Sequence, residues 1–221
     1  MRIGKVAILK AAILMICLCM MGLAACGEVV EQENKEVKDE VAATVSSISI
    51  EKDGSISSTI VEAFSGDFYY EDGDEGLNPM IESSIDEYTS ANASAQIKLK
   101  SLKVKDGVVR VLMEYGDYQA YAGFNREDFF AGTVKDANMA GFDLNVTLKS
   151  VSDDTQISKP ELLGMGDNHI VIEIIENAEA ADLIRVNCFD EILYISDGVT
   201  IVGKKSADVS LTDGYRIIVF K

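Results

Sequence analysis

Five Asp-Gly dipeptides are the strongest structural signal in this 221-residue sequence. Asp-Gly supplies the positive φ angles of a two-residue hairpin turn when runs of β-type residues flank it. Four of the dipeptides separate such runs, at Asp53-Gly54, Asp106-Gly107, Asp197-Gly198 and Asp213-Gly214. The pattern therefore predicts an α+β fold in which a mainly antiparallel sheet with several hairpins dominates.

Two short helices are expected beside this sheet. Over residues 76–91, apolar side chains recur at helical spacing with charged residues between them. Over residues 134–140, Thr133 is placed to cap the first turn, and Asp136 follows three positions later as in a capping box. Gly141 stands where a helix of this length ends.

Residues 1–25 have the layout of an export signal. Arg2, Lys5 and Lys10 form a basic start, and residues 11–23 follow without a charge. A membrane-spanning helix needs about 20 apolar residues. An uncharged run of this shorter length favours a removable signal peptide over a permanent membrane span.

The tetrapeptide Leu23-Ala24-Ala25-Cys26 closes the apolar run and resembles the lipobox of bacterial lipoproteins. The resemblance implies that the Cys26 thiol receives a diacylglycerol and that the signal is cleaved between Ala25 and Cys26. Two acyl chains give stable anchoring, whereas one chain binds a membrane only marginally. The implied localisation is the cell membrane, with the protein lipid-anchored and facing outside the cytoplasm.

Residues 26–45 are predicted to be an acidic tether, and residues 46–221 a single extracytoplasmic domain. Residues 27–45 hold six acids and two lysines, a composition typical of a solvated, extended segment. The whole chain has a net charge of −17, which repels nucleic acid. The expected partners are the membrane, through the lipid anchor, and an unknown protein or cell-wall component.

The segment from Tyr121 to Leu144 and the closing YRIIVFK are similar to uncharacterised lipoproteins of low-GC Gram-positive bacteria. No activity is established for this family, so the resemblance implies no catalytic residue. The positions that carry it are an aromatic pair, Gly-Thr-Val, a later Ala and a Gly-aromatic pair, here Phe129, Phe130, Gly132, Thr133, Val134, Ala137, Gly141 and Phe142.

A Cys-His dyad would have to use His169, the only histidine, and Cys188, the only cysteine after Cys26. We expect residues 170–174 and 183–189 to pair as strands. Matching the apolar faces of these strands buries Cys188 and points His169 outward. This register predicts a structural thiol and no catalytic dyad.

Acidic residues are most concentrated before the first predicted helix, at Asp67, Glu71, Asp72 and Asp74. Carboxylates are calcium ligands, and extracellular calcium sites can be weak. The order of these acids does not match a calcium-binding loop, and acids before a helix also interact favourably with its N-terminus. The helix-start interpretation is preferred, with a weak calcium site as the alternative, and no other cofactor is expected.

Tyr115, Tyr118 and Tyr121 recur at every third position. If this segment is helical, the three rings could line a ligand groove. The alternative is that the stripe packs into the core, as such stripes more often do.

These observations favour a membrane-tethered extracytoplasmic lipoprotein that acts as a non-catalytic binding or interaction module for an unknown ligand. A cell-envelope hydrolase using a carboxylate pair is the second interpretation, because the chain holds 37 acids. A solute-binding lipoprotein of a transporter is the third, although such proteins usually need two α/β lobes.

Overall fold

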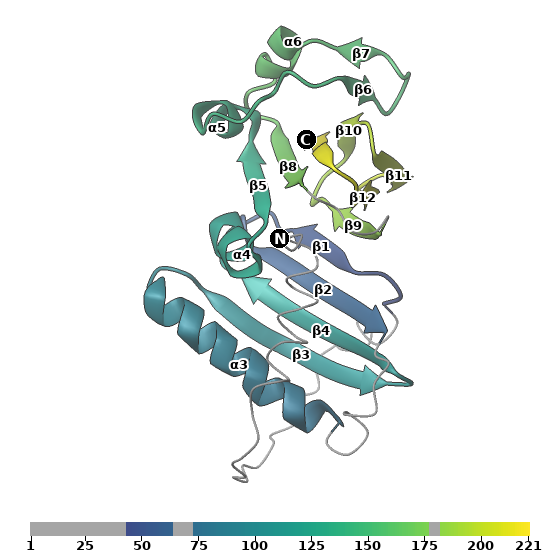
Figure 1. The fold of residues 1–221 in the computed structure, drawn as a ribbon. Coiled ribbons are helices and arrows are strands. Elements are labelled where there is room, and N and C mark those ends of the chain that lie inside the picture. Colours follow the sequence, from purple (N-terminus) through teal and green to yellow (C-terminus); the bar gives the residue numbers. More distant parts are fainter. Residues whose placement is uncertain (1–42, 64–72, 177–181) are drawn as a thin grey trace.

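The computed structural model describes residues 43–63, 73–176 and 182–221, which form two β-sheets (Figure 1). The strands of the first sheet are β1 (Ser47–Ile50), β2 (Ile56–Ala63), β3 (Ile97–Lys105), β4 (Val108–Tyr115), β9 (Leu183–Asn187), β11 (Val199–Gly203) and β12 (Ser206–Ser210). Those of the second are β5 (Asp128–Thr133), β6 (Leu148–Ser150), β7 (Gln156–Ile157), β8 (His169–Ile175), β10 (Ile192–Ser196) and β13 (Gly214–Phe220).

The seven-stranded sheet has the order β11-β12-β9-β1-β2-β4-β3, and the six-stranded sheet has the order β5-β8-β13-β10-β6-β7. Neighbouring strands are antiparallel throughout both sheets, except that β1 and β9 run parallel. The predicted α+β class with a dominant, mainly antiparallel sheet is confirmed.

Both predicted helices are present, as α3 (Gly73–Ala91) and α5 (Val134–Met139). The Thr133 hydroxyl accepts a hydrogen bond of 3.1 Å from the Asp136 amide, which is the predicted cap of α5. Gly141 has a φ of +85°, as expected for the residue that ends this turn.

Two further helices, α4 (Tyr118–Asn125) and α6 (Lys159–Leu163), were not predicted. They have eight and five residues, too few for a repeating apolar pattern to appear. Their starts are instead marked by local caps. The Asp117 carboxylate accepts from the Ala120 amide at 2.8 Å, and a capping box begins at Ser158.

The Asp-Gly turns divide into two kinds. Asp53-Gly54 and Asp106-Gly107 join hydrogen-bonded neighbours, β1 to β2 and β3 to β4. Asp197-Gly198 and Asp213-Gly214 instead carry the chain from one sheet to the other, so the hairpins expected at these two positions are wrong. A tight turn fixes the local reversal of the chain, but not the sheet in which the next strand finds its partner.

The predicted pairing of residues 170–174 with 183–189 is also wrong. Strand β8 pairs with β5 and β13, whereas β9 pairs with β1 and β12 in the other sheet. The prediction assumed that β8 has one apolar face. In fact β8 is buried on both faces, so its side-chain alternation does not specify a partner.

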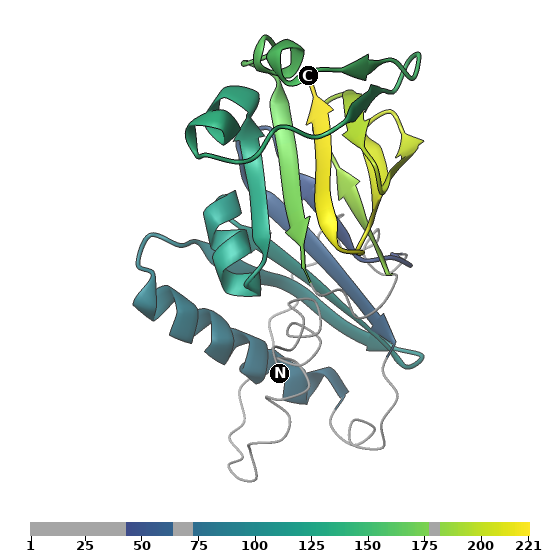
Figure 2. The ribbon, with the colours of Figure 1, turned by 45° about the horizontal axis from the view of Figure 1, so that its top comes forward.

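Two apolar clusters explain this double burial. One fills the space between the sheets and includes Ile48, Val171 and Phe220, together with buried residues of α3 and α4. The other lies on the opposite face of the six-stranded sheet, where α5 and α6 cover Ile170 and Ile172. Figure 2 shows β5, β8 and β13 lying in front of the seven-stranded sheet.

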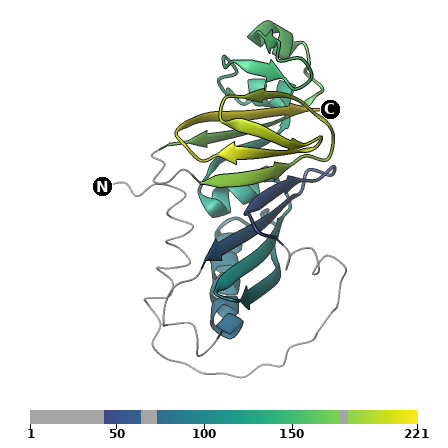
Figure 3. The same ribbon diagram turned by 90° about the vertical axis from the view of Figure 1, so that its right-hand side faces the viewer.

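Strands β2, β4 and β3 extend beyond the six-stranded sheet, and α3 packs along this extension (Figures 1 and 3). Leu77 and Ile85 of α3 are buried in the cluster between the sheets. Along β4, residues alternate strictly between buried and half-buried, which places one face against the core and the other outward. The buried hydrophobic residues of the described chain all lie between Ile48 and Phe220.

Candidate functional site

The outer face of the seven-stranded sheet is cationic at its β3 edge. Five of the chain's 20 lysines and arginines lie within residues 98–110. The four lysines of β3 are exposed, and Arg110 projects from the outward face of the neighbouring strand β4. We call this group the lysine surface; its members are Lys98, Lys100, Lys103, Lys105 and Arg110.

Most of the lysine surface has no counter-ion in the described part of the chain. Lys100 contacts Glu114 at 3.3 Å, which is an exposed pair of small energetic value. Lys103 stands directly opposite Arg110 in the β3–β4 register, a like-charge pair that disfavours strand pairing. Lysines also protect an edge strand such as β3 from aggregation. That role does not account for Arg110, which lies on the adjacent inner strand.

The middle of the same outer face satisfies its own polar groups. Asn187 donates to the Ser49 hydroxyl at 3.2 Å and accepts from the Ser206 hydroxyl at 2.8 Å. Arg185 forms two hydrogen bonds with Asp208, of 2.8 and 3.1 Å. Lys98 also stands opposite Glu114 in the β3–β4 register, whereas Lys103 and Lys105 form no ion pair with any carboxylate that the structure describes. In this respect the lysine surface differs from the middle of the face.

The N-terminal part of the described chain crosses this outer face. The Ser46 hydroxyl accepts from the Val61 amide of β2 at 3.0 Å. Three residues earlier, the Ala43 carbonyl accepts a hydrogen bond of 2.9 Å from Arg110 Nε on β4. From β1 toward the N-terminus, the chain therefore passes over β2 to β4, in the direction of β3.

Glu127 and Glu173 form an acid pair inside the molecule. Glu173 lies in the middle of β8, is 6% exposed, and its Oε2 atom has no hydrogen-bond partner. Glu127 precedes β5 and is half-buried, and its Oε2 accepts a hydrogen bond of 2.7 Å from the Tyr121 hydroxyl. The available sequence signal was one glutamate within the apolar run HIVIEII, and sequence analysis did not select it.

Burial is the main cause of the altered acidity of this pair. The pKa of Glu173 is raised to about 8, mainly by desolvation and also by the negative charge of Glu127, while the positive charge of Arg216 opposes the rise. Desolvation also raises the pKa of Glu127 to about 7, against the effect of the Tyr121 hydrogen bond. Both acids are therefore expected to be neutral in the folded protein at mildly acidic pH.

Arg216 faces Glu173 across the β8–β13 register but does not hydrogen-bond to it. Its guanidinium is held instead by the carbonyls of the preceding loop, with Nε donating to Ser210 at 3.0 Å and Nη2 donating to Thr212 at 2.7 Å. Glu173 is buried, and Glu127 is half-buried with one carboxylate oxygen bound to Tyr121, so the two acids are not presented together in an open pocket.

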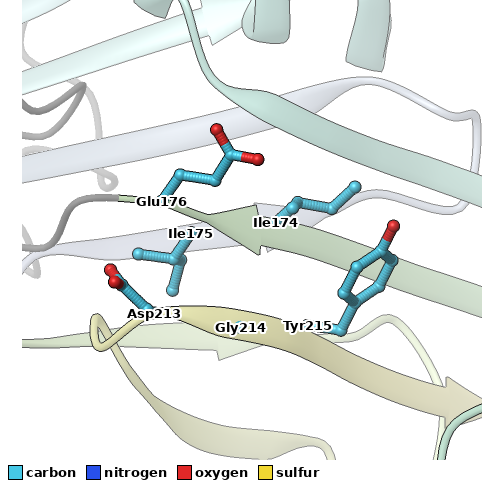
Figure 4. Close-up of a pocket in the computed structure, with 6 residues that line it drawn as sticks. All are labelled: Ile174, Ile175, Glu176, Asp213, Gly214 and Tyr215. Atoms are coloured by element: carbon cyan, nitrogen blue, oxygen red, sulfur yellow. The ribbon is translucent and has the colours of Figure 1, made fainter. Parts of the chain in front are cut away.

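A shallow surface hollow of about 450 Å³ lies where β8 ends and β13 begins (Figure 4). Figure 4 shows the side chains of Glu176 and Asp213 pointing in different directions, so they do not face one another across the hollow. The lining residues are Ile174, Ile175, Glu176, Asp213, Gly214 and Tyr215.

His169 and Cys188, the two residues of the dyad that the sequence argued against, share no hydrogen bond. Cys188 is 5% exposed, as predicted, and burial raises the pKa of its thiol to about 12. His169 is not directed outward as predicted. Its ring stacks on Phe220 and contacts the edge of Phe189, and its Nδ1 atom is buried without a partner.

The tyrosine stripe packs into the core, so the groove alternative for Tyr115, Tyr118 and Tyr121 is wrong. Tyr115 is fully buried and Tyr121 is 2% exposed. Their rings meet edge to face, and the ring of Tyr118 packs on Phe130. Tyr118 and Tyr121 belong to α4, whereas Tyr115 ends β4. Tyr115 and Tyr121 are turned into the core, and Tyr118 is half-buried.

Three of the four predicted calcium ligands lie outside the residues that the structure describes. Asp67, Glu71 and Asp72 lie outside the described residues, and Asp74 is placed only by its backbone, in the first turn of α3. Among the described residues, no three His, Cys, Asp or Glu side chains are arranged to hold a metal ion. The weak calcium site stays a prediction.

Comparison with models of protein families, with curated proteins and with solved structures finds no match for this chain. Within the described ranges, no helix is long and apolar enough to cross a membrane.

Proposed function

We propose that this chain is a lipoprotein anchored through Cys26 and facing outside the cytoplasm, with a folded part that is a non-catalytic binding module. The tetrapeptide Leu23-Ala24-Ala25-Cys26 supports the anchor. The observation that carries the binding role is the lysine surface. It places exposed cations on one face of a chain whose net charge is −17, and two of them, Lys103 and Lys105, form no ion pair within the described ranges.

The chemistry of this surface favours an anionic partner. Lysine ammonium groups are strongly hydrated point charges that pair with carboxylates and phosphates. The polar groups beside them are already hydrogen-bonded within the sheet, so the cations are the groups with unused binding capacity. We therefore propose an acidic component of the cell envelope, protein or wall polymer, as the partner.

Replacing Cys26 by Ala is expected to move the protein completely from the membrane fraction to the soluble fraction, because the thiol proposed to carry the lipid is then absent. Cell fractionation followed by immunoblotting measures this, and mass spectrometry of the N-terminal peptide identifies the lipid. Cys188→Ala is the matched control and should stay on the membrane. If Cys26→Ala remains membrane-bound, the anchor proposal is wrong.

Binding of a defined polyanion is expected to depend on the lysine surface. Immobilised inorganic polyphosphate is a suitable probe, offered to the chain that starts at residue 26 with Cys26→Ser. Replacing Lys98, Lys103 and Lys105 together by Gln should weaken binding at low salt by roughly tenfold or more, because several ion pairs act together.

The matched control for this experiment replaces three exposed lysines elsewhere, Lys52, Lys135 and Lys204, by Gln. Both triple variants lose the same charge, so only position distinguishes them. The control should retain wild-type binding. Equal weakening in both variants would show that total charge, and not the lysine surface, determines binding.

A further inference from the structure

We propose that the acidic segment of residues 27–42 docks on the lysine surface and covers it within the same molecule. This inference concerns the surface used in the proposed function, but it depends neither on acylation of Cys26 nor on an outside partner. Its occupant is defined by the chain itself, because these residues are covalently joined to residue 43, which already lies on this face.

The first argument for this docking is the path of the described chain. Ser46 is hydrogen-bonded to Val61 of β2, and Ala43 is hydrogen-bonded to Arg110 of β4. The next strand in this direction is β3, and Lys103 of β3 stands directly beside Arg110. The described chain therefore runs toward the lysines as it is followed from Ser46 back to Ala43.

The reach of the segment fits this placement. Neighbouring strands are about 4.8 Å apart, and three residues of extended chain span at most about 11 Å. Asp39 and Glu40 precede Ala43 by four and three residues. Their carboxylates can therefore reach Lys103, and Glu36 can reach further along β3.

The charges on the two sides are complementary. Residues 27–42 contain six acids and two lysines. Opposite them, Lys103 and Arg110 form a like-charge pair, and no carboxylate neutralises this pair in the described part of the chain. Delivery of carboxylates by the acidic segment would relieve the repulsion.

Covalent linkage makes weak individual contacts sufficient. A single exposed ion pair contributes little, but a short flexible linker gives its ends an effective concentration in the millimolar range. Several acids near several lysines then keep the segment on the surface for much of the time.

Zero-length crosslinking with a carbodiimide tests the docking directly, because it joins a carboxylate only to an amine in contact with it. The chain from residue 26 with Cys26→Ser is used, which retains every buried hydrophobic residue of the described core. Peptide mapping should find Glu36, Asp39 or Glu40 joined to Lys98, Lys103 or Lys105 at least fivefold more often than to Lys52, Lys135 or Lys204.

Two further arms separate docking from random contact. Raising the salt concentration to about 0.5 M, which shortens electrostatic range to a few ångströms, should remove most of these crosslinks. The Lys98/Lys103/Lys105→Gln variant should let a protease cut residues 27–42 at least threefold faster, while the Lys52/Lys135/Lys204→Gln control should not change the rate.

Crosslinks spread evenly over all exposed lysines would overturn the proposal, as would equal protease rates in the two variants. So would binding of the lysine surface to anionic phospholipid vesicles with no tether crosslinks, since the membrane would then be the occupant. None of these outcomes depends on membrane fractionation, so failure here is distinguishable from failure of the anchor proposal.

Discussion

Glu173→Gln is expected to stabilise the folded protein at pH 8.5 by about 2 to 4 kcal/mol and to have little effect at pH 4.5. The folded-state pKa of Glu173, about 8, lies well above its ordinary value of 4.5. Its neutral form is thus favoured by folding. The associated stability is fully present below pH 4.5 and is lost as the pH rises toward 8.

The physical reason is the buried and unpartnered carboxylate. At high pH the ionised Oε2 atom must stay in the core without a hydrogen bond, because the Arg216 guanidinium is committed to loop carbonyls. Glutamine has nearly the same shape and cannot ionise, so it removes this cost. Glu127→Gln should act in the same direction with a smaller effect, because Glu127 is only half-buried and keeps a hydrogen bond from Tyr121.

Urea unfolding at intervals from pH 4.5 to 9 measures both effects. The free energy of unfolding of the wild type should fall across this range relative to Glu173→Gln. Glu87→Gln, on the exposed surface of α3, is the control and should follow the wild-type profile. Parallel profiles for wild type and Glu173→Gln would show that Glu173 does not titrate as a buried acid.

Gly198→Ala is expected to destabilise the protein by about 3 kcal/mol or more. Gly198 has a φ of +78°, a conformation that costs an L-residue roughly 1 to 2 kcal/mol. An added Cβ would also lie 2.4 Å from Arg216 Nε and 2.7 Å from Arg216 Cζ. Arg216 is 9% exposed and held by the carbonyls of residues 210–213, so it cannot easily move aside.

Gly54→Ala is a matched control for this substitution. Gly54 also occupies an Asp-Gly turn with a positive φ, of +88°, but no heavy atom lies within 4 Å of its added Cβ. It should therefore show only the backbone cost. Denaturant unfolding of the two variants at one pH measures the difference, which reports the contact with Arg216. Equal losses would contradict the role assigned to this contact.

Position in the fold, more than turn sequence, explains why these two glycines differ. Both lie in the same dipeptide, but Gly54 joins adjacent strands at the rim of one sheet, whereas Gly198 lies where the chain changes sheets. The sequence predicted a tight turn at each. The crowding around Gly198 comes from Arg216, which is distant in sequence and arrives there only through the pairing of β13 with β8 and β10.

The candidate site shows the same division. The four lysines can be read from IKLKSLKVK, but strict alternation would place Lys98 and Lys100 on the opposite face from Lys103 and Lys105. The bulge between Leu99 and Ser101 brings Lys98 and Lys103 to the same face, and the structure alone shows that Arg110 and Ala43 lie beside them. For the tyrosine stripe, the sequence pattern left two structures open. Its spacing fits a groove as well as a core, and only the packing of α4 against the sheets turns Tyr121 inward.

The sequence by itself determined the local features of this protein: the tight turns, the cap of α5 by Thr133, the end of α3 at Ala91 and the alternation along β4. These features depend on residues within a few positions of one another. Tertiary structure alone decided which sheet each strand joins, how Glu173 comes to be enclosed and where the N-terminal segment crosses the sheet. Those outcomes depend on strand pairing over long sequence separations, and β8, apolar on both faces, gives no local signal of its partner.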